Sequence, residues 1–225
     1  MSTLNVDIWS DLVCPWCYVG KRRFDRALAA FPRREDVRVR WRSFELDPGG
    51  SREPAMSLPE RSHRDLGGTR ADTDRRMAML TDLAAQEGLV YRLDLARAVN
   101  SFDAHRLLQY ADREGRGEAV RERLMSAYVA EGAVLSDLGT LADLAAECGL
   151  DPVATRAVLD DGGFAEEVRA DELRARELGV SGVPTFVFGQ RYAVSGAQPV
   201  EVFSQVLSQT FTDAGDGTET TARLP

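Results

Sequence analysis

The sequence predicts an α/β fold in which a long helical segment interrupts one mixed, four-stranded sheet. Strand patterns occur near both ends of the 225-residue chain. Residues 72–180, which lie between them, show helical periodicity throughout. Neither end could form a stable sheet alone, because an isolated strand–helix–strand unit and an isolated hairpin are both marginal. The two ends are therefore expected to pair with each other.

The N-terminal part has the pattern strand, helix, strand. Leu4–Trp9 is rich in Val, Ile and Trp and indicates a strand. From Pro15 to about Phe31 apolar residues recur at helical spacing, and Pro32 ends the helix. Val37–Leu46 alternates apolar residues with arginines, which predicts a second strand. A strand–helix–strand unit whose elements are joined by short connections makes its two strands parallel neighbours.

The C-terminal part has the pattern strand, strand, helix. The runs PTFVFG and RYAVSG predict a hairpin, and Pro199 opens a last helix. We expect 1–48 and 180–211 to form one unit and 49–179 to be an inserted helical domain. The insertion should begin with a loop to about Ala71 and continue as six helices. Residues 212–225, rich in Gly, Thr and Asp, are expected to be a disordered tail.

Composition excludes several classes of protein. The formal net charge is −8, so phosphates would be repelled and nucleic acid is not an expected partner. No run of about 18 apolar residues suggests a membrane span, and residues 1–11 do not resemble a signal peptide. A cytoplasmic location is therefore expected, where thiols stay reduced. Three cysteines in that compartment do not indicate a disulfide scaffold.

Cys14 and Cys17 form the motif Cys-Pro-Trp-Cys between the first strand and the first helix. Pro15 suits the first helical turn and places Cys14 at the helix N-cap. There the free N–H groups and the positive end of the helix dipole favour a thiolate. Cys17 lies one turn further and points back toward Cys14. The pair could close and reopen a disulfide, with Cys14 as attacking thiolate and Cys17 as shielded resolving thiol.

Two other interpretations of the cysteine pair stay open. Structural zinc needs four ligands, and beyond the pair the chain offers only Cys148, His63, His105 and carboxylates. No metal site is therefore expected. The pair could also be two thiols that fall close by accident. Cys148 fits the apolar stripe of a helix and is expected to be buried and inert.

Five motifs resemble the DsbA-like thioredoxin-fold family, and in particular its FrnE-type oxidoreductases. In chain order they are SDLVCPWCYVGKRRFDRAL, WRSFELDP, NSFDAHRLL, GVPTFVFG and GAQPVEVF. The resemblance runs from Asn5 to about Phe211. It implies a thioredoxin fold with the helical block inserted, and the sheet order second, first, third, fourth strand. We expect the helical block to pack over the cysteine end of the sheet and to narrow the groove that substrates enter.

The resemblance also implies site residues. The Val183–Pro184 bond would be cis beside the cysteines, with Val183, Pro15 and Trp16 in contact with substrate. His105 would line the same groove, although packing within its helix is the alternative. Relatives often carry a buried acid six residues before the first cysteine, to accept the proton of the resolving thiol.

That position is Ile8 in this chain. Asp7 should face the opposite side of the strand by alternation, and Asp11 sits in the loop before the cysteines. Asp11 or water therefore remain as candidates for the proton acceptor.

The function implied is a dithiol–disulfide oxidoreductase that acts by mixed-disulfide exchange on thiol- or disulfide-containing proteins or small molecules. No cofactor would be bound, and glutathione is a candidate redox partner. One alternative is a glutathione-dependent isomerase or transferase of the kappa-class type. Those enzymes typically have serine at the first cysteine position and lack the second, whereas this chain keeps both. Another is an accessory protein of a biosynthetic (polyketide) pathway with an incidental redox pair.

Overall fold

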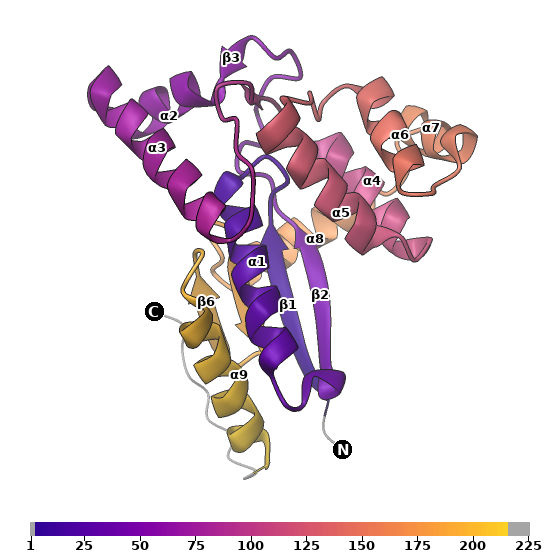
Figure 1. The fold of residues 1–225 in the computed structure, drawn as a ribbon. Helices are drawn as coiled ribbons and strands as arrows, with labels where there is room; N and C mark the ends of the chain where they lie inside the picture. Colours follow the sequence, from indigo (N-terminus) through magenta and orange to yellow (C-terminus); the bar gives the residue numbers. More distant parts are fainter. Residues whose placement is uncertain (1–2, 216–225) are drawn as a thin grey trace.

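A computed structural model describes residues 3–215 of the chain. Its main sheet has the strand order β2-β1-β5-β6 (Figure 1). The bounds are β1 (Leu4–Ser10), β2 (Val37–Ser43), β5 (Thr185–Phe188) and β6 (Tyr192–Ser195). β1 runs parallel to β2 and antiparallel to β5, and β5 is antiparallel to β6. The predicted fold and strand order are therefore confirmed.

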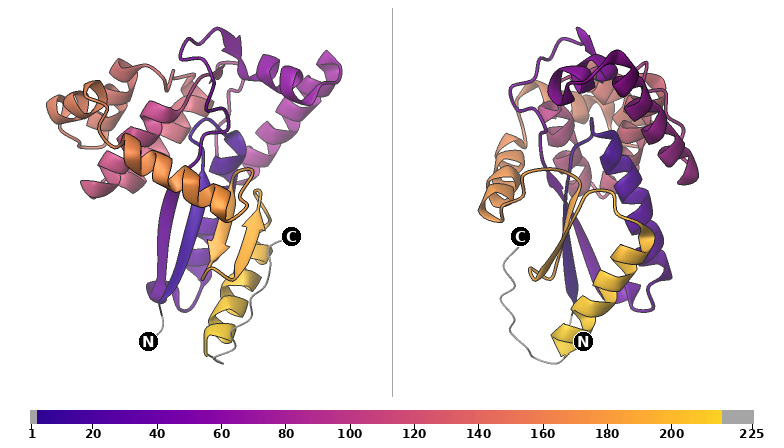
Figure 2. Two further views of the ribbon diagram at one scale, coloured as in Figure 1. Left: turned by 180° about the vertical axis from the view of Figure 1, so that it is seen from behind. Right: turned by 90° about the vertical axis from the view of Figure 1, so that its left-hand side faces the viewer.

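Helices cover both faces of this sheet (Figure 2). On one face, α1 (Pro15–Ala30) and α9 (Val200–Gly215) pack together over an aromatic core. In that core the ring centroids of Phe186 and Phe203 are 4.6 Å apart. On the other face, α8 (Ala165–Glu177) packs against Trp9 of β1.

The helical insertion leaves the sheet after β2 and returns just before β5. A two-stranded sheet of β3 (Met56–Ser57) and β4 (Arg97–Ala98) lies within it. Its other elements, up to α8, are α2 (Leu58–Leu66), α3 (Arg70–Gln86), α4 (Phe102–Arg113), α5 (Gly117–Ser126), a π-helical turn (Ala127–Glu131), α6 (Leu138–Glu147) and α7 (Pro152–Asp160).

The insertion packs over the cysteine end of the sheet, as predicted. In Figure 1 its helices surround the start of α1. One apolar core joins Val13, Cys14, Cys17 and Tyr18 to buried residues of α3, α4, α5 and α6. Among residues 3–215, no helix combines the length and the apolar character that crossing a bilayer requires.

Three boundaries differ from the predicted ones. The expected loop to Ala71 contains α2, which begins with a capping box in which Ser57 and Glu60 bond each other's backbone N–H. β2 ends at Ser43 rather than Leu46, because the Leu46 N–H donates to the Asp11 carboxylate instead of to a strand.

At the C-terminus, residues 212–215 of the expected disordered tail are helical. The hydroxyls of Thr210 and Thr212 donate to the carbonyls of Val206 and Ser208, one turn earlier in α9. The remainder of the expected tail, 216–225, lies outside the described residues.

Candidate active site

Cys14 is the N-cap residue of α1, as its position before Pro15 predicts. Its backbone is extended, with φ −104° and ψ 108°, and Pro15 starts the helix. The Cys17 N–H donates to the Cys14 carbonyl at 3.0 Å, which closes the first turn. The Cys14 sulfur thus lies where the N–H groups of the first helical turn are concentrated.

Cys17 is the more shielded thiol of the pair. Its exposed fraction is 0%, against 5% for Cys14, so Cys14 is also more buried than an exposed nucleophile would be. The Asp11 N–H points at the Cys17 sulfur from 3.4 Å. Burial first, and then hydrogen bonding and charge from Cys14, raise the pKa of Cys17 well above its ordinary value. Both cysteines are free thiols in this structure.

The loop before β5 approaches the cysteines directly. The Val183–Pro184 peptide bond is cis, and the Val183 carbonyl oxygen lies 3.9 Å from the Cys14 sulfur. α1 approaches this loop so closely that a Cβ added at Gly20 would lie 2.8 Å from Cγ of Pro184. A cavity of about 370 Å³ lies beside the loop, with Val183 and Pro184 in its wall.

The two residues between the cysteines differ in exposure. Pro15 is buried, and its carbonyl accepts a 2.6 Å hydrogen bond from the Tyr91 hydroxyl of the insertion. Trp16 is 37% exposed and is the large apolar side chain at the rim of the site. The sequence alone does not predict this contact of Tyr91, because Pro15 lies far away from it along the chain.

His105 does not line an open groove, so its predicted contact with substrate is wrong. Only 2% of it is exposed. Its Nε2 lies 3.1 Å from the Phe44 carbonyl oxygen and 3.4 Å from Oδ1 of Asp11. The Asp11 carboxylate is fully buried and also accepts hydrogen bonds from the N–H groups of Val13 and Leu46. Asp7, as expected, faces away and pairs with Arg42.

A charged cluster ties α1 to the insertion. The buried ammonium of Lys21 lies 2.7 Å from Asp25, 2.6 Å from Glu118 and 3.3 Å from Glu122. Glu122, which belongs to α5, also bonds the Tyr18 hydroxyl. Burial, followed by Glu122, raises the pKa of Tyr18 to about 12. These contacts fix the helix that carries both cysteines.

The remaining candidate residues do not converge on the pair. Cys148 caps the end of α6, is only half-buried, and directs its sulfur to the Ala119 carbonyl at 3.5 Å. The expectation of a buried Cys148 is therefore wrong, because the cap position lies at the edge of the helix packing. Within residues 3–215, no group of three or more His, Cys, Asp or Glu side chains could hold a metal ion.

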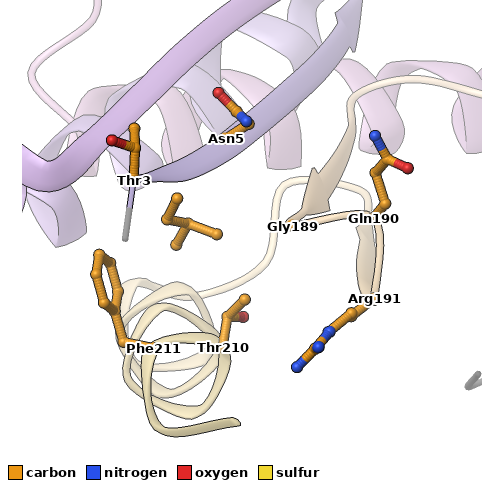
Figure 3. A pocket seen from close by; sticks show the side chains of 8 residues that line it. Thr3, Asn5, Gly189, Gln190, Arg191, Thr210 and Phe211 are labelled. Atoms are coloured by element: carbon orange, nitrogen blue, oxygen red, sulfur yellow. The ribbon is translucent and has the colours of Figure 1, made fainter. Parts of the chain in front are cut away.

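A second cavity lies at the opposite end of the sheet and plays no part in this site. Figure 3 shows this space of about 240 Å³, which is bounded by the start of β1, the turn between β5 and β6, and α9. Cys14 follows the other end of β1. The lining residues are Thr3, Leu4, Asn5, Gly189, Gln190, Arg191, Thr210 and Phe211.

Known proteins are similar to this chain in sequence or in structure. A solved structure of a probable DsbA oxidoreductase from Streptomyces coelicolor is 43% identical, with a TM-score of 0.90 over 99% of this chain and 94% of that one. The uncharacterized protein YwbO of Bacillus subtilis (strain 168) is 25% identical over 210 residues, which cover 92% of this chain and 96% of YwbO.

A third protein is similar in fold alone. The cytosolic disulfide reductase DsbM of Pseudomonas aeruginosa is 20% identical, with a TM-score of 0.62 over 92% of this chain and 98% of that one. A family model described as the DSBA-like thioredoxin domain matches residues 5–208. With its sheet order, its inserted helices and this match over most of its length, the chain belongs to the DSBA-like thioredoxin domain family.

Proposed function

We propose that this protein is a dithiol–disulfide oxidoreductase that works through Cys14 and Cys17 by mixed-disulfide exchange. The observation that carries the proposal is the asymmetry of the pair. Cys14 caps a helix N-terminus beside the Val183 carbonyl, and Cys17 lies fully buried one turn behind it. A nucleophilic thiol and a shielded resolving thiol require different surroundings of this kind.

The reaction proceeds in two exchange steps. The Cys14 thiolate attacks one sulfur of a substrate disulfide, that S–S bond breaks, and one substrate thiolate leaves. Cys17 then loses its proton and attacks the Cys14 sulfur, which forms the Cys14–Cys17 bond and releases the second thiolate. The substrate gains two electrons and the protein loses them. The same steps in reverse oxidise a dithiol, so the redox partner sets the direction.

Substrate binding is assigned to the loop beside the pair. The backbone of Val183 lies next to the Cys14 sulfur and could pair with an extended peptide as a short strand edge. Trp16 offers an exposed ring at the same rim. The contact surfaces proposed for substrate are therefore Val183, Pro184, Pro15 and Trp16.

Glutathione is the redox partner that we propose, and no bound cofactor is required. A structure of DsbM, a protein of similar fold, has been solved with glutathione. A cytosolic relative by fold is consistent with a cytoplasmic location. Membership of the FrnE-type branch remains a proposal that rests on the five sequence motifs.

Trapping of mixed disulfides tests the function. Cys17→Ala should accumulate covalent adducts with substrate thiols, because nothing remains to resolve them, whereas Cys14→Ala should accumulate almost none. Cys148→Ala is the matched control and should exchange disulfides like the unmodified protein. Equal trapping by the Cys14 and Cys17 variants would contradict the assigned roles. Full function in a Cys14→Ala/Cys17→Ala double variant would favour an accessory role.

A further inference from the structure

The resolving step needs a route for one proton. Cys17 attacks only after it has lost its proton, and burial opposes that loss. Asp7 is turned away toward Arg42, and position 8, which shares the α1 face of the strand, is the apolar Ile8. The residues next to Cys17 therefore have to supply another route.

Ser10 is the polar side chain best placed to begin it. Val6 and Ile8 face α1, so strand alternation turns Ser10, at the end of β1, toward the same helix. The next residue, Asp11, contacts the Cys17 sulfur through its N–H at 3.4 Å. The Ser10 hydroxyl is buried and has no hydrogen-bond partner among the described residues. Burial is the largest cause of the raised pKa of Cys17, and the nearby Ser10 side chain opposes that rise.

A small cavity of mixed polar and apolar lining, with Leu12, Trp41, Leu108 and Met125 in its wall, borders Ser10. Its volume is about 10 Å³, close to the minimum for one water molecule. Ser10, Ser43, Gln109 and His105 are among its lining residues. Gln109 already bonds Ser43 and Asp171, so the Ser10 hydroxyl and the His105 imidazole are the partners that a water held here would join.

His105 lines the same cavity. A carbonyl oxygen only accepts, so the contact with Phe44 places the ring proton on Nε2 and leaves Nδ1 as the acceptor of the neutral imidazole. The Asp11 carboxylate, 3.4 Å from Nε2, would stabilise the imidazolium that forms. Asp11 is itself held by the N–H groups of Val13 and Leu46.

We propose that Ser10, one water molecule and His105 form a buried relay that removes the proton of Cys17 while the mixed disulfide is resolved. The proton leaves the Cys17 sulfur for Ser10, Ser10 passes its own to the water, and the water protonates His105. Asp11 is a positioning residue for His105. The departing substrate thiolate takes up a proton from solvent, and His105 afterwards releases the relayed proton to solvent, so that proton and charge both balance. This relay rests on the proposed function.

The charged groups around His105 come from each neighbouring element. Asp11 faces it from the loop after β1. Arg42 of β2, Asp112 of α4 and Arg121 of α5 line the same cavity. Asp112 and Arg121 pair with each other at 3.3 Å. Their charges therefore partly cancel, and Asp11 is the carboxylate nearest to the imidazole.

A two-phase exchange reaction separates the relay from the first attack. The reduced full-length chain is mixed with Ellman's reagent, and release of the coloured thiolate is followed by stopped flow. Attack by Cys14 gives the first phase and resolution by Cys17 the second. Ser10→Ala should leave the first phase unchanged and slow the second about tenfold or more, as expected for loss of assisted proton transfer. Ser10→Thr, which keeps the hydroxyl, should restore most of the rate.

The matched control is Thr155→Val, which removes another buried hydroxyl without a described partner, in α7. It should change neither phase. An unchanged second phase in Ser10→Ala, or Ser10→Thr as slow as Ser10→Ala, would overturn the relay.

If Ser10→Ala does not fold, the second phase of the exchange reaction is measured for the unmodified protein in mixtures of H₂O and D₂O. A curved isotope dependence of the second phase supports several moving protons, and no isotope dependence overturns the relay. Absence of the first phase would instead remove the proposed function.

Discussion

The Tyr91 hydroxyl donates a 2.6 Å hydrogen bond to the carbonyl of Pro15, the residue that follows the first cysteine. The Tyr91 ring also stacks with Tyr18 of α1, with ring centroids 6.4 Å apart. The insertion therefore holds the first turn of the cysteine helix by one hydrogen bond and one aromatic contact. Disturbing this bond should affect both stability and the geometry of the redox pair.

Tyr91→Phe should lower the free energy of unfolding by about 1–3 kcal/mol, because it leaves a buried carbonyl without its donor. Chemical denaturation measures this change. Tyr192→Phe is the control, since its hydroxyl bonds Asp213 near the surface and water can replace that bond. Equal losses in the two variants would mean that burial of the Pro15 carbonyl carries no particular cost.

Gly20→Ala should destabilise the protein by about 1–3 kcal/mol in spite of the better helix propensity of alanine. The added Cβ would lie 2.8 Å from Pro184, so either α1 or the loop before β5 must move. Exchange with a disulfide-linked peptide should slow as well. Gly139→Ala in α6 is the control, because its added Cβ meets only the carboxylate of Asp137. A Gly20 variant as stable and active as Gly139→Ala would contradict the close approach.

Lys21→Met should cost about 1–2 kcal/mol of stability. Its ammonium is shared by Asp25, Glu118 and Glu122, which would repel one another without it. The loss stays below that of a fully buried pair, because all three carboxylates are partly open to water. Arg34→Met, which breaks the exposed pair with Glu35, should change stability by less than about 0.5 kcal/mol. Melting curves of the two variants provide the comparison.

Asp11→Asn should make the free energy of unfolding fall less steeply as the pH is lowered. Burial alone would raise the pKa of Asp11, but hydrogen bonding and charge from His105, with the Leu46 N–H, lower it below 3.8 overall. A lowered pKa means that the ionised carboxylate stabilises the fold above the unfolded value, and that this contribution disappears as pH falls through the folded value. Denaturation between about pH 5 and pH 2 should therefore show a steeper decline in the unmodified protein than in the variant. Asp74→Asn, at an exposed position on α3, should keep the original slope.

Cys14 should react first with a limiting alkylating agent at neutral pH, although Cys148 is the more exposed thiol. Cys14 lies at the N-terminus of α1, a position typical of reactive cysteines, whereas burial, as the largest cause, raises the pKa of Cys148. Peptide mapping by mass spectrometry locates the label. Label found mainly on Cys148 would show that access outweighs thiolate stabilisation at this site.

Local patterns predicted most of the fold. Alternation in Val37–Ser43 and the position of Pro15 each depend on a few neighbouring residues, so the strand and the N-cap at Cys14 follow from the sequence. α2 was missed because none of its residues is buried and, besides Pro59, its apolar side chains are only Leu58 and Leu66. Its capping box, Ser57 with Glu60, is the signal that could have found it.

The site was predictable only where its residues are close along the chain. Cys14 and Cys17 lie within one turn of helix, and the helical block was expected at the same end of the sheet. The burial of His105 depends on Phe44 and Asp11, which two other segments bring to it. Such contacts follow from tertiary packing and leave no periodic signal in the sequence. Gly20, a lone glycine in a helical pattern, was a signal of close packing that could have been used.

The pairing of Ile8 with Phe186 joins strands from the two ends of the chain, and this has a consequence for biosynthesis. At about 5–20 residues per second, the ribosome needs roughly 10–30 s to add the residues between Cys14 and Pro184. During that interval the helices of the insertion can form from local contacts, but β1 has no β5 to pair with. The nascent chain therefore contains both thiols before the loop that lies over Cys14 has been made.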